Sequence, residues 1–477
     1  MVDYPDWVLK QKTKGTEIRN IGSNYYLYKI RSEWDKVKKR PKKITGDYLG
    51  RITEEGLIKP KNQRLIEAQK NISVKEFGAS KFITTQSNDI IQNLKETFPD
   101  IWKEIFTFAV YRFFSASPLK NVQSQYQTSY LSEIIPDTKV SSKTLSNIIQ
   151  TIGKQRNLIK TFLSKYIIPG ESIVVDLTHV FSLSENIISS TLGRNSEGNY
   201  TPQINLFLLF SLDRMQPMFY RVLPGSVRDV SSLLLSIEES GVKDITVIGD
   251  KGFYSENNIQ ELDIPHIKYI FPLKRNSLLI DYSRINEAGK KGFEGHFLFE
   301  KRVIWYYERK VNEKRIVTFL DNRLKVEEEK DFLIRADGDK EKLGEFYENE
   351  KKFGTITIIT GTGSSAQEIF ELLKSRVEIE VVFDTFKNTL HADRSYMGDD
   401  FALEGWMFVN FIALLLYYKV YALLMSKNLL NNCSPKDVIL HLSRVYKLKI
   451  GDNWVLSEVP KKSRLLIEKL GIENVIT

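Results

Sequence analysis

The chain of 477 residues has very little cysteine: only Cys433, with five scattered histidines. One cysteine cannot form an intrachain disulfide or a cysteine-based zinc site, so both kinds of site are excluded. So little cysteine is typical of a protein that works in a reducing compartment, and we expect a cytoplasmic protein.

The sequence also lacks a long uncharged apolar run. The first ten residues, MVDYPDWVLK, contain no apolar signal core. The most hydrophobic stretch, GWMFVNFIALLLYY at 405–418, is bounded by Glu404 and Lys419. Because about 20 apolar residues are needed to cross a bilayer, this stretch predicts a buried core helix and no membrane partner.

Internal repeats and low-complexity tracts are absent as well, and the hydrophobic content of 42% is ordinary for a globular protein. A single core rarely grows past a few hundred residues, so several domains are expected. The formal net charge is +9. This surplus fits a polyanionic partner such as nucleic acid, although many basic proteins bind none.

Residues 1–61 are basic and predict a β-rich N-terminal region. Segments 25–31 and 44–52 have the composition of strands, and between them stands the run KVKKRPKK at 36–43. One interpretation is a solvated hairpin loop. The other is a basic finger along DNA phosphates, flanked by Trp34 and tyrosines that stack on bases or sugars. It would bind through Lys38, Lys39, Arg40, Lys42 and Lys43.

Residues 62–165 predict a helical DNA-binding domain. Apolar residues recur at helical spacing over 100–114. Segments 130–135 and 141–152, separated by Pro136-Asp137, resemble a helix-turn-helix in which Ser141 caps the second helix. A second helical region is expected at the C-terminal end, over 431–477.

From about residue 166 the sequence pattern changes to alternating strand-like and helix-like segments. Three successive strands, then helix, strand, helix, strand, predict an α/β fold with a mixed sheet over 166–275. Residues 276–362 predict a β-rich insertion with charged turns. Residues 364–390 then predict one long helix, and 363–430 completes the catalytic core begun at 166.

Three acidic residues stand out in this core. Asp176 ends the apolar run SIVVD, and Asp250 follows the strand-like DITVIG. Taken alone, each aspartate is more often a turn residue than a ligand. Glu380 lies on the predicted helix, where at 100° per residue Arg376 and Lys387 fall within about 40° of it. The alternative for this helix is an ordinary amphipathic helix with surface ion pairs.

Such a set of carboxylates suits phosphodiester chemistry. In-line displacement at phosphorus needs charge stabilisation on both the attacking and the leaving oxygen, and two Mg²⁺ ions about 3.5–4 Å apart provide it. Magnesium prefers oxygen ligands, so neither cysteine nor histidine is required. His179, three residues after Asp176, is more readily a packed or DNA-facing residue than a magnesium ligand.

Together these residues resemble a known family. Arg376-x3-Glu380-x6-Lys387 is similar to the Tyr-x2-Arg-x3-Glu-x6-Lys signature of insertion-sequence DDE transposases, with Leu373 at the tyrosine position as a departure. Asp176 in VVDLTHVFS and Asp250 in VIGDKGFYS resemble the two aspartate strands. The long gap before Glu380 fits members that carry a β-strand insertion.

The resemblance implies an RNase H-like core that uses Mg²⁺, or Mn²⁺, held by Asp176, Asp250 and Glu380. It also implies a cut-and-paste reaction on double-stranded DNA, namely inverted repeats at transposon ends and target DNA, by a homodimer in a synaptic complex. Arg376 and Lys387 would contact DNA. In relatives an aromatic residue of the insertion grips a flipped base, and Trp305 is the candidate, although a tryptophan in a strand is most often core. The expected place of action is the nucleoid.

Two other functions fit parts of the pattern. A structure-specific nuclease or resolvase on the same RNase H fold would cleave branched DNA without joining strands. A catalytically silent, sequence-specific DNA-binding protein would bind equally with and without Mg²⁺; the intact acidic triad argues against it.

Overall fold

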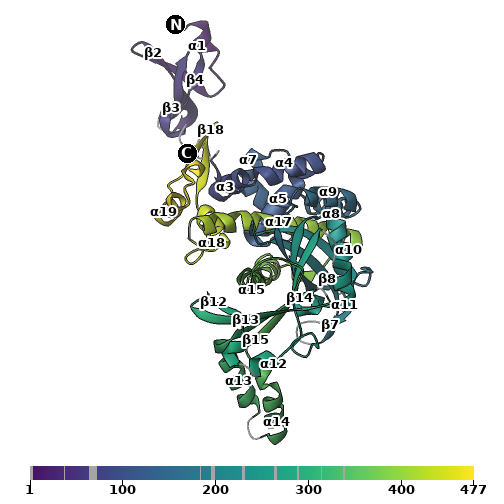
Figure 1. The fold of residues 1–477 in the computed structure, drawn as a ribbon. Coiled ribbons are helices and arrows are strands. Elements are labelled where there is room, and N and C mark those ends of the chain that lie inside the picture. Colours follow the sequence, from purple (N-terminus) through teal and green to yellow (C-terminus); the bar gives the residue numbers. More distant parts are fainter. Residues whose placement is uncertain are drawn as a thin grey trace. The chain divides into compact units, whose positions relative to one another are not determined.

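The computed structural model describes residues 4–36, 38–63, 72–182, 184–194, 199–227, 231–262, 266–286, 289–312, 314–336 and 339–476. The chain separates into two compact units. One comprises residues 1–76 with 445–459, and the other comprises residues 77–444 with 460–477. Figure 1 labels many of their elements.

The first unit is built on a four-stranded antiparallel sheet in the order β1 (Thr16–Ile21), β2 (Asn24–Asp35), β3 (Arg40–Thr53) and β4 (Gly56–Ile58). One face of this sheet carries a small core of Val8, Ile18, Leu27 and Ile52, to which α1 (Asp6–Leu9) contributes Val8. Successive strand residues point to opposite faces. The opposite face therefore carries a cluster of half-buried tyrosines and an arginine: Tyr26, Tyr28, Tyr48 and Arg19.

Strands β2 and β3 form a hairpin, and both are longer than the sequence pattern indicated. The basic run between the two predicted strands is therefore not simply a loop. Its second half lies within β3, where Arg40 pairs with Asp35 and Lys43 pairs with Ser32. Lys38 and Lys39 form the turn, and Lys39 has a positive φ of 44°. Cross-strand pairing outweighed the low strand preference of a lysine-rich segment.

A three-stranded sheet completes this unit: β5 (Ser73–Glu76), β17 (Tyr446–Ile450) and β18 (Asn453–Leu456). The expectation of helices throughout 431–477 was therefore wrong for this hairpin. The cause is a non-local partner, because β17 pairs with β5 from the other end of the chain. The helices α18 (Pro435–Leu442) and α19 (Lys461–Leu470) do flank the hairpin in sequence.

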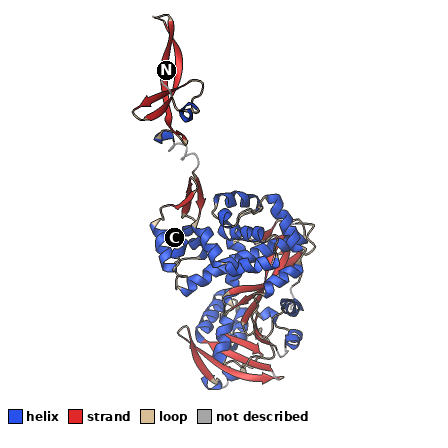
Figure 2. Cartoon of the chain, turned by 90° about the horizontal axis from the view of Figure 1, so that it is seen from above, coloured by secondary structure: helices blue, strands red, loops and turns tan. Residues whose placement is uncertain are grey.

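In the second unit, a helical layer surrounds the long helix α17 (Asp400–Ser426), as Figures 1 and 2 show. This helix contacts α5 (Trp102–Ser115), α8 (Ser142–Gly153) and strand β9 (Gln216–Pro224). It is long and apolar enough to cross a membrane, but 72% of its most apolar window is buried inside the protein. The prediction of a buried core helix is confirmed.

The other helices of this layer are α3 (Gly78–Gln86), α4 (Asn88–Thr97), α6 (Leu119–Thr128), α7 (Leu131–Ile134) and α9 (Arg156–Ser164). Ser141 caps α8 as predicted, since its side chain accepts a hydrogen bond from the Thr144 amide at 3.1 Å. One side of α8, with Ile149 and Ile152, is buried, and α17 is its main neighbour.

Beside this layer lies one large mixed sheet. Its central strands follow the order β9, β8 (Tyr200–Ser211), β6 (Ser172–Ser182), β10 (Ile245–Ile248) and β11 (Ile267–Pro272). The first three form an antiparallel meander, and β10 and β11 run parallel to β6. The helices α10 (Ser231–Ser240) and α11 (Glu256–Leu262) make the crossovers. This topology is RNase H-like, and the predicted fold class is confirmed.

The expected insertion continues the same sheet. Strands β12 (Gly295–Phe299), β13 (Arg302–Val311), β14 (Lys314–Asp321) and β15 (Thr355–Thr360) follow one another antiparallel, and β15 pairs with β11. The sequence pattern predicted these strands but not the helices α13 (Asn322–Arg335) and α14 (Lys340–Asn349) between them. Helix α13 buries no residue, so it has no apolar stripe to reveal it. An Asp321 cap and surface pairs such as Arg323–Glu327 support it.

Candidate active site

Asp176 lies on β6, and Asp250 lies two residues past the end of the neighbouring parallel strand β10. In the register of β6 and β10, Val174 is opposite Ile248, and two residues further along each chain come Asp176 and Asp250. Asp250 is the N-cap residue of the short 3-10 helix η1 (Lys251–Phe253), but its side chain makes no capping hydrogen bond. The carboxylate of Asp250 is therefore not used to hold the turn together.

Glu380 reaches this place from a helix that is not continuous, in contrast to the prediction. Helix α15 (Ala366–Lys374) ends before α16 (Val377–Asp384) begins. At the break the Ser375 hydroxyl donates to the Glu371 carbonyl at 3.0 Å, a backbone contact that commonly bends helices. The amide of Arg376 donates a hydrogen bond to the carbonyl three residues earlier, at Leu373. A tighter turn thus replaces one regular α-helical turn.

The same helix ends in a second irregularity, a π-helical turn, η4 (Thr385–Thr389). The amide of Leu390 donates to the Thr385 carbonyl, five residues back. The 3.6-residue register between Glu380 and Lys387 therefore does not extend through this turn. Lys387 instead lies near His179 of β6, where burial and the lysine charge lower the histidine pKa.

Arg376 links two of the acids. Its guanidinium lies 2.9 Å from Glu380 Oε1, through Nη2, and 3.6 Å from Asp176 Oδ2, through Nη1. Glu380 is mostly exposed, whereas Asp176 and Arg376 are each 22% exposed. Asp250, Arg376 and Glu380 line a cleft of about 450 Å³ together with Leu373 and two lysines, Lys251 and Lys374.

The acids act on one another electrostatically. The pKa of Asp176 is raised to about 6, first because the carboxyl is desolvated. The Leu177 amide, at 2.8 Å, and Arg376 lower this pKa, whereas Asp250 and Glu380 raise it again. Mutual repulsion among carboxylates at a desolvated position is relieved by a bound cation. Perturbed acids of this kind cluster at functional sites.

The donor set suits a hard divalent ion. All three candidate ligands are carboxylates, which Mg²⁺ and Mn²⁺ accept. Within the part of the chain that the structure describes, no three His, Cys, Asp or Glu side chains converge into a ready-made metal site. Arg376 supplies a positive charge between Asp176 and Glu380, so a metal ion held by these two acids would have to replace its contacts.

The lysines of the cleft were missed at the sequence level. Lys251 directly follows Asp250, and Lys374 stands two residues before Arg376. The one sequence feature that could have indicated these two lysines is that they stand next to predicted site residues. Burial lowers the pKa of Lys374, as does the neighbouring charge of Arg302.

Trp305, the predicted base-gripping residue, lies on β13 in the extension of the sheet. It is half-buried: Lys290 lies 5.2 Å from its ring centroid, and the His296 ring lies 4.9 Å away. It does not line the acidic cleft. The basic residues 38–43 belong to the other compact unit.

Comparison with known proteins adds a family match. Residues 184–416 match the family described as "Transposase DDE domain". The match supports a transposase of the DDE type. The matched stretch contains Asp250, Arg376 and Glu380, and Asp176 lies just before its start. It thus includes two of the three predicted acids.

No curated protein sequence matches the chain. Among solved structures, a cryo-EM structure of the piggyBac transposase synaptic complex with hairpin DNA is similar at a TM-score of 0.42 and 10% identity. The similarity covers 78% of this chain and 76% of that one. The sequence match to the transposase domain, rather than this distant likeness, supports a role in DNA transposition.

Proposed function

We propose that the protein is a cut-and-paste transposase that hydrolyses phosphodiester bonds at transposon ends and then joins the freed ends to target DNA. The observation that carries this proposal is that Asp250 and Glu380 line one cleft with Arg376, whose guanidinium also pairs with Asp176. The transposase-domain match, which spans Asp250 and Glu380, supports it.

In this proposal the three carboxylates are the ligands of Mg²⁺, with Mn²⁺ as a substitute. Bound divalent ions would stabilise charge on the attacking and leaving oxygens of the phosphodiester. Arg376, released from Asp176 and Glu380 when an ion binds, would pair with a DNA phosphate. Lys387 would hold the DNA backbone further along β6.

Other parts of the chain would position DNA. We assign residues 1–61 and the helical region 62–165 to DNA binding, with the phosphate contacts made by the hairpin residues Lys38, Lys39, Arg40, Lys42 and Lys43. Trp305 would stack on a flipped base near the cut. A homodimer would pair two inverted repeats in a synaptic complex, and the protein would act at the nucleoid.

Strand β10 offers a matched pair of variants to test this proposal. Asp250 follows the strand and Asp244 precedes it, and Asp244 is an exposed residue paired with His266 at 2.9 Å. Purified wild-type protein and the Asp244→Asn variant should cleave DNA that carries the element's terminal inverted repeats when Mg²⁺ is present. The Asp250→Asn variant should bind this DNA with similar affinity and leave it uncut. EDTA should stop cleavage by the wild type and by Asp244→Asn.

The products distinguish the proposed reaction from its alternatives. Joining of cut ends to a second DNA supports transposition. Cleavage of branched DNA without terminal repeats and without joining indicates a resolvase or nuclease instead. DNA binding that is the same with and without Mg²⁺, with no product strand, indicates a binding protein. Full cleavage by the Asp250→Asn variant would contradict the assignment of Asp250 as a metal ligand.

A further inference from the structure

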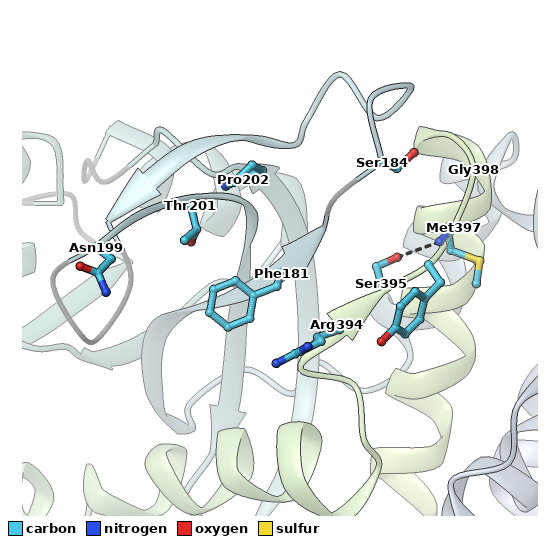
Figure 3. Close-up of a pocket in the computed structure, with 10 residues that line it drawn as sticks. Phe181, Ser184, Asn199, Thr201, Pro202, Arg394, Ser395, Met397 and Gly398 are labelled. Atoms are coloured by element: carbon cyan, nitrogen blue, oxygen red, sulfur yellow. Dashed lines mark hydrogen bonds between the residues drawn. The ribbon is translucent and has the colours of Figure 1, made fainter.

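Two surfaces outside the acidic cleft differ sharply in charge. One is a cavity of about 740 Å³ at the end of β6, lined by Phe181, Thr201 and Met397 among others (Figure 3). Arg394 is the one charged residue among the described residues that line it. The other surface belongs to the small sheet of β5, β17 and β18, whose strands carry three lysines and a tryptophan. Only the second surface has the charge that suits a polyanionic partner.

The strand register gathers the lysines of this small sheet on one face. Lys75 of β5 lies opposite Lys447 of β17. Two residues further along β17, Lys449 lies opposite Trp454 of β18. Directly opposed residues point to the same side of a sheet, and side chains alternate along each strand, so these four side chains share a face. The remaining charged residue of the three strands, Glu76, lies on the other face.

Trp454 restrains two of these lysines. The Lys75 ammonium lies 5.8 Å from the centre of a Trp454 ring, and the Lys449 ammonium lies 5.9 Å from it. A cation over an aromatic face is attracted to the ring, and all of these side chains are half-buried. The ring therefore holds two positive charges from different strands together, so that less side-chain entropy is lost when an anion binds them.

The arrangement also places like charges next to one another. Lys75 and Lys447 are direct cross-strand neighbours, a placement that destabilises a sheet by itself. Phosphates bound over this face would offset the repulsion between the ammonium groups. Lys447 and Lys449 are about 7 Å apart along their strand. This separation matches about two phosphates of one DNA strand, at about 3.4 Å each along the helix axis.

We propose that this face, formed by Lys75, Lys447, Lys449 and Trp454, binds the phosphate backbone of DNA. A lysine contacts a phosphate as a point charge and does not read base edges, so the contact does not depend on base sequence. The site is separate from the hairpin at 38–43, because β17 and β18 come from the C-terminal part of the chain. It rests on the proposed action on DNA.

The salt dependence of DNA binding tests this site. The full chain is titrated in EDTA with two duplexes of equal length, one carrying the element's terminal inverted repeat and one of unrelated sequence. The double variant Lys447→Gln, Lys449→Gln should lower the slope of log binding constant against log salt concentration by about 1.8 on both duplexes, since each phosphate contact contributes about 0.9. A lower slope on the terminal repeat alone would support the contact and place it on the transposon end.

Matched variants separate charge from structure. Lys330 on α13 and Lys351, which follows α14, are exposed. The double variant Lys330→Gln, Lys351→Gln removes the same charge from the chain and should leave the slope unchanged. The variant Lys447→Arg, Lys449→Arg keeps both charges on the sheet and should keep the slope of the wild type.

A second measurement uses the wild type and does not depend on how the variants fold. Duplex DNA should protect Lys447 and Lys449 from acetylation by an N-hydroxysuccinimide ester, read by mass spectrometry, and should leave Lys330 reactive. An unchanged slope on both duplexes for a folded glutamine variant, or unprotected lysines on β17, would overturn the proposal. The Asp250→Asn variant should keep the wild-type slope while losing cleavage, so that failure of this site and failure of the catalytic assignment are separate results.

Discussion

Arg376 is the counter-ion of Asp176, at 3.6 Å, and the same guanidinium also pairs with Glu380. Its position results from the tight turn that separates α15 from α16, at which Arg376 directly precedes α16. A regular helix through this point would not contain that turn. The break between α15 and α16 therefore lies at the residue whose guanidinium pairs with both acids.

The first prediction concerns this arginine. Arg376→Met removes the charge that lowers the Asp176 pKa and the expected phosphate contact. DNA cleavage should therefore fall about 100-fold or more, the lower end of the effect of removing one electrostatic contact at a reacting group. Single-turnover cleavage at saturating DNA measures the effect. Arg376→Lys should retain part of the rate, and an undiminished rate in Arg376→Met would show that this residue has no part in the reaction.

The second prediction concerns the crossing of α8 and α17. A Cβ at Gly405 would lie 2.0 Å from the Ile149 carbonyl oxygen, so Gly405→Ala has to push the helices apart. We expect a loss of about 1–3 kcal/mol in the free energy of unfolding, as for other overpacked positions. Urea unfolding measures it.

Helix α14 supplies the matched control for this variant. A Cβ at Gly344 would meet nothing within 4 Å, so Gly344→Ala should be neutral or stabilise the protein by up to about 1 kcal/mol. Equal unfolding midpoints for the two alanine variants would contradict the close-contact explanation.

The third prediction concerns a buried arginine that contacts the chain just after the helix of Glu380. Arg112 of α5 is only 4% exposed. Its guanidinium donates to Asn410 Oδ1 at 2.9 Å, to the Ala116 carbonyl at 2.7 Å and to the carbonyl of Leu390, just beyond η4. Arg112→Met leaves these buried acceptors unpaired, at about 1–3 kcal/mol each.

We therefore expect Arg112→Met to lower the unfolding free energy by about 3 kcal/mol or more. Thermal and urea unfolding of the full chain both report it. Arg335, in the last turn of α13, is exposed and serves as control. Similar midpoints for Arg112→Met and Arg335→Met would show that the buried network does not stabilise the fold.

The fourth prediction is a pH effect at the start of α17. Asp399 accepts a hydrogen bond from the Ala402 amide at 2.9 Å, and this bond, followed by that from Gln150, lowers its pKa. Because the folded-state pKa lies below the unfolded one, the stabilisation is fully present above the unfolded value of about 3.9 and is lost as pH falls through the folded value.

At neutral pH, Asp399→Ala should cost about 0.5–2 kcal/mol, as for other N-caps. The difference in melting temperature between wild type and variant should be constant above about pH 5 and shrink below about pH 4. A difference that widens on acidification would contradict the role of the ionised cap.

Local patterns predicted much of the core. The strand sequence that ends in Asp176 and the one before Asp250 were recognisable because each is short, apolar and followed by polar residues. Their order along the chain also predicted the mixed sheet. What could not be predicted was long-range pairing: that β15 joins β11, and that β17 pairs with β5. Such pairs depend on partners far apart in sequence, which no local periodicity reports.

The helix that carries Glu380 shows a second kind of feature that the sequence did not predict, namely local breaks in a helix. Its apolar spacing predicted a continuous helix over 364–390, and the position of Arg376 one turn before Glu380 was found by that argument. The bend at Ser375 goes with one hydroxyl–carbonyl contact, and the π-helical turn begins at the buried Thr385. Neither changes the hydrophobic pattern, so neither was visible in the sequence.

The most direct test of the central claim maps the metal ligands themselves. Fe²⁺ replaces Mg²⁺ in the purified protein, and ascorbate with peroxide then generates hydroxyl radicals that cut the chain next to the bound ion. Cuts should cluster around residues 176, 250 and 380, should be suppressed by excess Mg²⁺, and should disappear in Asp250→Asn but not in Asp244→Asn. Cuts that fall elsewhere, or that persist unchanged in Asp250→Asn, would contradict a metal site formed by these three carboxylates.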